Sequence, residues 1–150
     1  MKVPAQPLVV VGVDGSDSSK AALRWAADYA ASVGARLDVL TAWHLPTTFA
    51  GPGYIPAGFD LGVDYDKVLE QVVDEVFGAE RPSFLRLVVR EGGAAQLLME
   101  ASKDADLLVV GSRGHGGFAG LLLGSVSAKL AEHAKCPVLI MHGQLVAQKP

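Results

Sequence analysis

The segment Gly111–Ser127, GSRGHGGFAGLLLGSVS, concentrates residue types that suit the binding of a phosphate chain. It holds six glycines and three serines, with one arginine and one histidine. Glycine adopts positive φ angles and lets a backbone approach a ligand closely. A helix is expected to begin near Ser125, and a helix N-terminus presents free N–H groups and a partial positive charge. The segment therefore predicts a phosphate-binding loop; the alternative is a flexible connection without a ligand.

Two common phosphate-loop patterns do not fit this segment. Gly111 and Gly116 have the glycine spacing of a Walker A motif, but Gly117 stands where that motif requires lysine. Residues 114–119 satisfy the loose dinucleotide pattern Gly-x-Gly-x-x-Ala. They follow the fourth expected strand, however, and no acidic residue closes the second one. The Walker A pattern fails, and a dinucleotide oxidoreductase is disfavoured.

Other kinds of reactive or metal site are poorly supported by the residues present. Cys136 is the single cysteine, so no intramolecular disulfide forms and a reducing cytosol is the simplest setting. His133 lies close to it in sequence, but a zinc site needs about four ligands and no second pair appears. No Gly-x-Ser-x-Gly elbow is present to carry a nucleophilic serine.

Length, composition and charge limit the class of protein. The chain has 150 residues, of which 50% are hydrophobic, which predicts one domain over residues 1–150 with a substantial core. A net charge of −3 with scattered basic residues argues against a nucleic-acid partner. No segment approaches the roughly 20 apolar residues of a membrane span. We expect a cytoplasmic protein with neither nucleic-acid nor membrane partners.

Strand-like and helix-like segments alternate along the chain. Strands are expected over residues 8–13, 36–43, 83–90, 106–111 and 137–142. Helices are expected between them, the first ending at Gly34 and the others over residues 63–78, 94–105 and 125–134. Only the long Gly/Pro-rich loop within residues 45–66 interrupts the alternation. This pattern predicts an α/β fold with an open doubly wound five-stranded parallel sheet, Rossmann-like, in the order 3-2-1-4-5.

The expected strand order places the glycine segment beside a crevice. Ligands of open α/β sheets bind beyond the carboxyl ends of the strands, where the strand order reverses. In the order 3-2-1-4-5 that point lies between the first strand, which ends at Gly12–Asp14, and the fourth, which ends at Gly111. The glycine segment is therefore expected at the mouth of a ligand site.

The spacing of the glycines resembles the ATP-binding pattern of the universal stress protein family. That pattern is Gly-x2-Gly-x9-Gly-[Ser/Thr], and Gly111, Gly114, Gly124 and Ser125 fill every position. Residues 9–30 are also similar to the first strand and helix of that family, and residues 104–141 to its C-terminal third. The resemblance implies an adenine-nucleotide site of the ATP-binding branch, with ATP and Mg²⁺ as cofactors.

The resemblance also implies roles for residues at the strand ends. Asp14 would bind ribose hydroxyls or the adenine amino group, or help to hold Mg²⁺; alternatively it caps the first helix. Gly12 and Val13 would lie against the base, and Ala42 would line the adenine pocket. Around the ribose and phosphates the resemblance places Gly111, Ser112, Arg113, Gly114, His115, Gly116, Gly117, Gly124, Ser125 and Val126. Of these, Arg113 is alternatively a solvated side chain.

The function that the resemblance implies is regulatory. Universal stress proteins act as sensors or modulators in stress response and growth arrest, and we expect at most slow ATP hydrolysis here. One alternative is an enzyme on the same fold, such as an ATPase, a nucleotidyl transferase or a flavoprotein subunit. Another is a dimerisation module in which ATP is structural. The resemblance further implies a homodimer through the last strand, Pro137 to His142.

Overall fold

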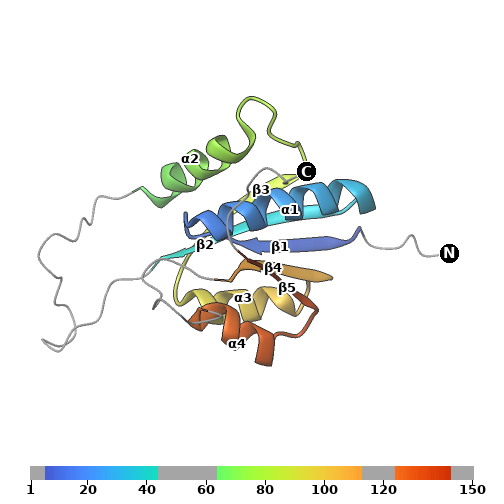
Figure 1. Ribbon diagram of the computed structural model, residues 1–150, viewed down its shortest axis with the longest axis vertical. Helices are drawn as coiled ribbons and strands as arrows, with labels where there is room; N and C mark the ends of the chain where they lie inside the picture. The colour runs from blue at the N-terminus through green and yellow to red at the C-terminus, as the bar shows by residue number, and fades with distance from the viewer. Residues whose placement is uncertain (1–5, 44–63, 113–123, 143–150) are drawn as a thin grey trace, which may run out of the picture.

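A twisted parallel sheet forms the centre of the protein (Figure 1). The computed structural model describes residues 6–43, 64–112 and 124–142. Within them lie five strands: β1 (Leu8–Gly12), β2 (Arg36–Trp43), β3 (Leu85–Glu91), β4 (Leu107–Gly111) and β5 (Val138–Met141). All neighbouring strands are parallel and their order is β3-β2-β1-β4-β5. The predicted doubly wound sheet and its strand order are confirmed.

Helices cover both faces of this sheet. The helices are α1 (Asp17–Val33), α2 (Tyr65–Phe77), α3 (Ala94–Ser102) and α4 (Ser125–His133). Figure 1 shows α1 and α2 on one face and α3 and α4 on the other. Helix α3 ends earlier than predicted. The N–H groups of Lys103 and Asp104 donate to the carbonyls of Glu100 and Ala101, three residues back, instead of continuing the i→i−4 pattern. This tight turn leads the chain into β4.

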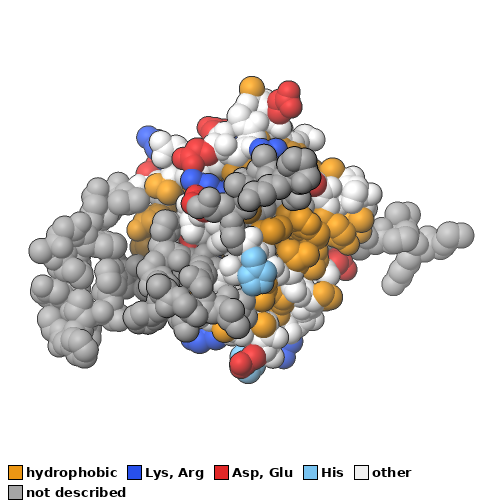
Figure 2. Space-filling view, in the orientation of Figure 1, with side chains coloured by type: hydrophobic (Ala, Val, Ile, Leu, Met, Phe, Trp, Pro, Cys, Tyr) orange, Lys and Arg blue, Asp and Glu red, His pale blue; other side chains and the backbone are white. Residues whose placement is uncertain are grey.

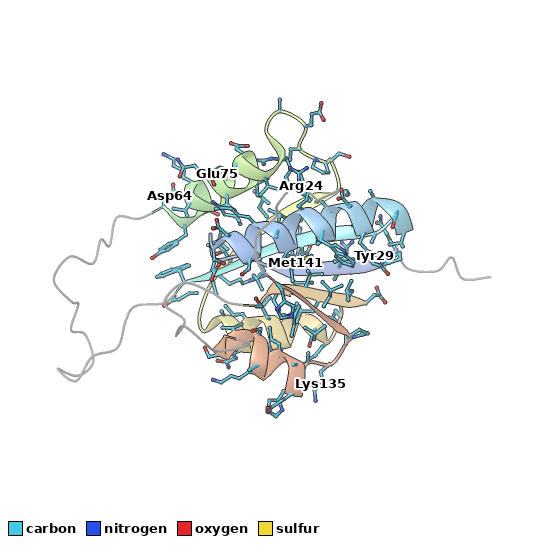
Figure 3. The ribbon with its side chains drawn as sticks, viewed as in Figure 1. Arg24, Tyr29, Asp64, Glu75, Lys135 and Met141 are labelled. Atoms are coloured by element: carbon cyan, nitrogen blue, oxygen red, sulfur yellow. The ribbon has the colours of Figure 1, made fainter. Side chains whose placement is uncertain are left out.

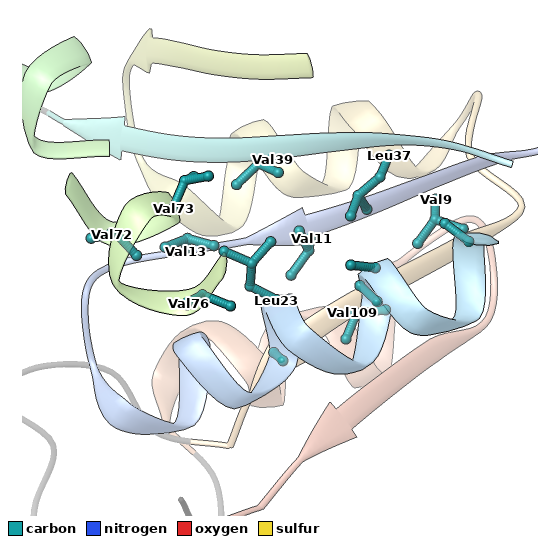
Figure 4. Close-up of a cluster of buried hydrophobic side chains, with 14 of the residues drawn as sticks. Val9, Val11, Val13, Leu23, Leu37, Val39, Val72, Val73, Val76 and Val109 are labelled. Carbon is teal, nitrogen blue, oxygen red and sulfur yellow. The ribbon is translucent and has the colours of Figure 1, made fainter. Parts of the chain in front are cut away.

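The central strand β1 is apolar on both faces because both faces are covered. Val9 and Val11 belong to the core beneath α1 and α2, whereas Val10 belongs to the core beneath α3 and α4. All three side chains are at most 1% exposed. Successive side chains of a strand point to opposite faces, so a doubly covered strand appears as an unbroken apolar run. Figure 4 shows the first of these two clusters, with Leu23 of α1 among its side chains.

The ends of α1 correct one interpretation of the sequence and confirm another. Ser16 is the N-cap, and its hydroxyl oxygen accepts from the N–H of Ser19 at 3.3 Å. The alternative role of Asp14 as the cap is therefore wrong. The carboxylate of Asp14 accepts from the N–H of Ser16 at 2.9 Å and so stabilises the turn before the helix. Gly34 ends the helix at a φ of 68°, as predicted.

Helices α1 and α2 are also joined by side chains. The guanidinium of Arg24 donates to the carbonyl of Val76 in the last turn of α2, and it lies 5.4 Å from the centre of the Phe77 ring. Lys20 forms an ion pair with Glu75 on the same pair of helices. In Figure 3 the labelled Arg24 and Glu75 lie along this junction. Helix α2 is therefore fixed against α1 as well as against the sheet.

Two valines of α2 offer a matched test of core packing. Val73 is 0% exposed and Val68 is 44% exposed. We expect Val73→Ala to lower the free energy of unfolding by about 1.5–3 kcal/mol, because it removes buried apolar surface and leaves a cavity. Val68→Ala should change it by less than about 0.5 kcal/mol. Both variants make the same change in helix propensity, so urea unfolding of the pair isolates burial. Equal losses would contradict this packing.

Candidate functional site

The carboxyl ends of β1, β2 and β4 meet at one edge of the sheet. Val11 of β1 is in register with Val39 of β2 and with Val109 of β4, so the residues that follow these positions emerge side by side. Asp14 follows β1, and Ser112 follows β4. The reversal of strand order between β1 and β4, where a crevice is predicted, is therefore confirmed, and the crevice itself stays a prediction.

The start of α4 is tied to the end of β4 by one carbonyl group. The carbonyl oxygen of Ser112 accepts from the N–H of Gly124 at 2.6 Å and from the hydroxyl of Ser127 at 3.0 Å. The N–H of Ser112 in turn donates to the carbonyl of Met141 in β5, at 2.8 Å. The two ends of the glycine segment are thus held together beside the crevice. The sequence analysis did not predict this role for Ser127; its only signal was a position three residues after Gly124.

The N-terminus of α4 has the features of an anion site. Gly124 is the N-cap and supplies no side-chain hydrogen bond, and the first turn carries no acidic residue. The first N–H to bond back within the helix is that of Ala128, to the Gly124 carbonyl. Ser125 is exposed and Val126 is partly buried. Free N–H groups at a helix N-terminus, with the helix dipole behind them, stabilise a bound anion.

Asp14 lies exposed at the rim of this crevice. It precedes Gly15, whose φ of 84° is one that a residue with a Cβ rarely adopts. The ionised carboxylate accepts hydrogen bonds through both oxygens, and Oδ1 already receives the N–H of Ser16. Acceptance of ribose or adenine donors, and Mg²⁺ binding, both remain predictions for this residue.

Other predicted base contacts are engaged in the fold itself. Val13 is 5% exposed within the core. Its N–H donates to the carbonyl of Leu40, and its carbonyl accepts from the hydroxyl of Thr41. A Cβ on Gly12 would approach the side chain of Leu98 to 2.8 Å. Contact of Gly12 or Val13 with a base therefore stays a prediction, and it would be apolar rather than hydrogen-bonded for Val13.

Gly111 is required by a close approach between β4 and α1. A Cβ at this position would lie 2.8 Å from the Ser18 carbonyl carbon and 2.9 Å from the Ser19 nitrogen. Both are backbone atoms, which cannot move aside as a side-chain end can. Ser112 beside it is 5% exposed. The first glycine of the pattern thus has a packing role before any ligand is considered.

Ala42 is partly buried at the end of β2 and pairs with Arg90 of β3. Its predicted place in an adenine pocket stays a prediction. Five further predicted site residues lie outside the described residues: Arg113, Gly114, His115, Gly116 and Gly117.

Two further features concern metals and thiol chemistry. Across residues 6–43, 64–112 and 124–142, no three His, Cys, Asp or Glu side chains gather as metal ligands would. Partial burial, followed by the nearby charge of Asp106, raises the pKa of the Cys136 thiol. The thiol is therefore protonated at neutral pH and is a poor nucleophile.

None of the helices in the described ranges has the length and apolar character needed to cross a bilayer.

An all-parallel sheet with helices on both faces and a reversal of strand order between β1 and β4 defines a doubly wound α/β protein. The universal stress protein family model matches residues 8–142. The universal stress protein Rv2623 of Mycobacterium tuberculosis is 36% identical over 153 aligned positions, which cover 97% of this chain and 48% of that protein. The chain belongs to the universal stress protein family. It spans about half the length of the curated relatives it matches.

Two solved structures of universal stress proteins share this fold. A universal stress protein crystallised in complex with cAMP is 35% identical, with a TM-score of 0.65, over 93% of this chain and 98% of that one. A universal stress protein from Archaeoglobus fulgidus in complex with dAMP is 24% identical, with a TM-score of 0.53, over 91% and 98% of the two chains. The second comparison shows the shared fold alone.

Substitution of Gly111 tests the contact between β4 and α1. We expect Gly111→Ala to lower the free energy of unfolding by about 1–3 kcal/mol without any ligand, because the added Cβ overlaps backbone atoms. Gly93→Ala is the control, since a Cβ there meets nothing within 4 Å. Its effect should stay below about 1 kcal/mol, the usual scale of an N-cap change. Chemical denaturation measures both; a Gly111→Ala protein as stable as the original would show that this contact is loose.

Proposed function

We propose that the protein binds an adenine nucleotide, ATP with Mg²⁺, in the crevice between β1 and β4. The observation that carries the proposal is the double hydrogen bond to the Ser112 carbonyl, which holds the N-terminus of α4 open toward the crevice. The complete glycine pattern and the related universal stress protein in complex with cAMP support it.

Each part of the nucleotide has a partner of suitable chemistry in this arrangement. The terminal phosphates accept the N–H groups of Ser125 and Val126, and the Ser125 hydroxyl adds a contact. The Asp14 carboxylate accepts the ribose hydroxyls or the adenine amino group, or helps to bind Mg²⁺. The small side chain of Ala42 leaves room for the base. Residues 113–117 complete the loop around the phosphates.

We assign the site a regulatory role rather than a catalytic one. The glycine segment offers contacts to phosphates but contains no lysine. Fast phosphoryl transfer depends on positive groups that stabilise the transition-state charge. A site of this composition binds the nucleotide and turns it over slowly, which suits a cytoplasmic sensor in stress response or growth arrest.

Calorimetric titration with ATP and Mg²⁺ tests the proposal. We expect the original protein to bind with a dissociation constant of about 1–100 μM, equivalent to roughly −8 to −5.5 kcal/mol. The double variant Gly114→Ala/Gly124→Ala should lose binding, and Ser125→Ala should weaken it about tenfold, as the loss of a hydrogen bond to a charged group does. Ser83→Ala, an exposed serine in a turn before β3, is the matched control.

The outcome depends on protein that is folded and free of bound nucleotide. Circular dichroism checks the fold of each variant, and the absorbance at the nucleotide maximum checks for carried-over ligand. No ATP binding by such protein, or equal binding by all variants, would overturn the proposed site.

We also propose that β5 pairs with a second copy of the chain. This strand is at one edge of the sheet. It is apolar on both faces: Leu139 and Met141 pack with the core under α1, and Val138 and Ile140 with the core under α3 and α4. All four side chains are only partly buried. A short apolar edge strand of this kind favours pairing with another strand.

Light scattering tests the dimer. We expect a mass twice the 15.6 kDa of the chain. Met141→Glu should shift the protein toward the monomer, because it introduces a charge at the paired edge. Val68→Glu, at an exposed position of α2, should leave the mass unchanged. A monomeric mass for the original protein at all concentrations would exclude this interface.

A further inference from the structure

A second cavity lies on the α3 face of the sheet, away from the nucleotide crevice. Helix α3 packs against α4 and, among the strands, chiefly against β1, β2 and β4. The space between α3 and the strands has a volume of about 550 Å³. Small-molecule sites have volumes of about 300–1,000 Å³. The cavity shares no lining residue with the candidate nucleotide site.

The walls of this cavity combine apolar side chains with charges of both signs. Leu8 and Val10 of β1 and Leu40 of β2 form its floor, with Leu97 of α3 opposite. The strands also contribute Arg36, Asp38, Arg86 and Arg90, whereas the α3 side contributes Glu100 and Asp104. The cavity therefore suits a ligand with an apolar body and two opposite charges.

Asp38 gives this cavity its most specific feature. Its side chain is 14% exposed, and Oδ2 accepts from the guanidinium of Arg86 at 3.2 Å. The other oxygen, Oδ1, is buried and has no hydrogen-bond partner among the described residues. A buried carboxylate oxygen without a donor is unfavourable, and native structures satisfy nearly all such atoms. Asp38 also lines the cavity, so an ammonium group bound there would meet a carboxylate whose hydrogen bonding is incomplete.

Arg86 is placed to bind the opposite charge of the same ligand. Its side chain is 62% exposed, so its bond to Asp38 is a weak surface contact and the guanidinium can turn at little cost. Only one of its five N–H donors is used in that bond. Arg36, on the same strand face two residues before Asp38, adds positive charge nearby. A carboxylate next to the amino group of a ligand would meet these arginines.

We propose that this cavity binds an apolar α-amino acid. The ammonium group donates to Asp38, the carboxylate accepts from Arg86, and the apolar side chain lies against Val10, Leu40 and Leu97. The amino group and the carboxylate of an α-amino acid are attached to one carbon. Asp38 and Arg86 are likewise directly paired across β2 and β3. The proposal does not depend on nucleotide binding, because the two sites have no residue in common.

Titration of the nucleotide-free protein with L-leucine, followed by amide NMR spectra, tests this proposal. We expect binding at about 1 mM or tighter, with signal changes at Val10, Leu40, Val88 and Leu97 and none at Ser125. Asp38→Asn, which keeps the shape of the side chain, should weaken binding at least tenfold. Asp28→Asn, an exposed position on α1, is the matched control and should leave it unchanged.

Altered ligands and a second variant keep the proposal testable even if Asp38→Asn does not fold. L-leucinamide lacks the carboxylate and N-acetyl-L-leucine lacks the ammonium, so each should bind at least tenfold more weakly than L-leucine. Should Asp38→Asn fail to fold, Arg86→Gln changes an exposed side chain and should weaken L-leucine while sparing L-leucinamide. No signal changes at the cavity, or equal affinity for all three ligands, would overturn the proposal.

Discussion

The arrangement of the candidate site depends on the two hydrogen bonds that the Ser112 carbonyl accepts. This carbonyl closes β4 against the first turn of α4, while the N–H of the same residue extends the sheet to β5. Gly111, immediately before it, brings β4 against the backbone of α1. A single dipeptide thus joins two helices, α1 and α4, and two strands, β4 and β5, at the point where the strand order reverses. Because rigid elements position a site more accurately than loops, the open N-terminus of α4 is held in place by the fold.

The extent to which helices cover each strand explains where the sheet carries apolar and where it carries charged side chains. Helices cover both faces of β1, so its side chains are apolar throughout. The α3 face of β2 and β3 is only partly covered, and there the strands carry Asp38, Arg86 and Arg90. On the opposite face Arg24 of α1 contacts the last turn of α2 and joins the two helices that cover the sheet there. Polar residues therefore occur where the helices of a five-stranded sheet leave a gap.

Most of the fold could be predicted from the sequence, because the spacing of apolar residues distinguishes buried strands from helices. The β-branched run of β1, the spacing of Ala22 to Ala30 and the cap at Gly34 all report local structure. Residue type alone does not fix the beginning of α1, because aspartate and serine both cap helices and only the path of the chain selects Ser16 over Asp14. The hydrogen bond from the Ser127 hydroxyl to the Ser112 carbonyl joins residues 15 positions apart, and no local sequence pattern indicates it. Long-range hydrogen bonds of this kind depend on the folded arrangement. The predicted nucleotide site therefore rests on glycine spacing, strand order and the family resemblance, and it stays a prediction.

Asp38 shows where a local pattern and a folded environment disagree. In the sequence Arg-Leu-Asp-Val-Leu an aspartate between apolar residues indicates a solvent-facing strand position. In the fold the Asp38 side chain is only 14% exposed, and its Oδ1 has no hydrogen-bond partner among the described residues. A leucine or valine there would fit the apolar floor without that cost. Residues that break a local rule are expected at functional or strained sites, and the Arg86 guanidinium beside Asp38 is the observation from which we infer recognition of paired opposite charges.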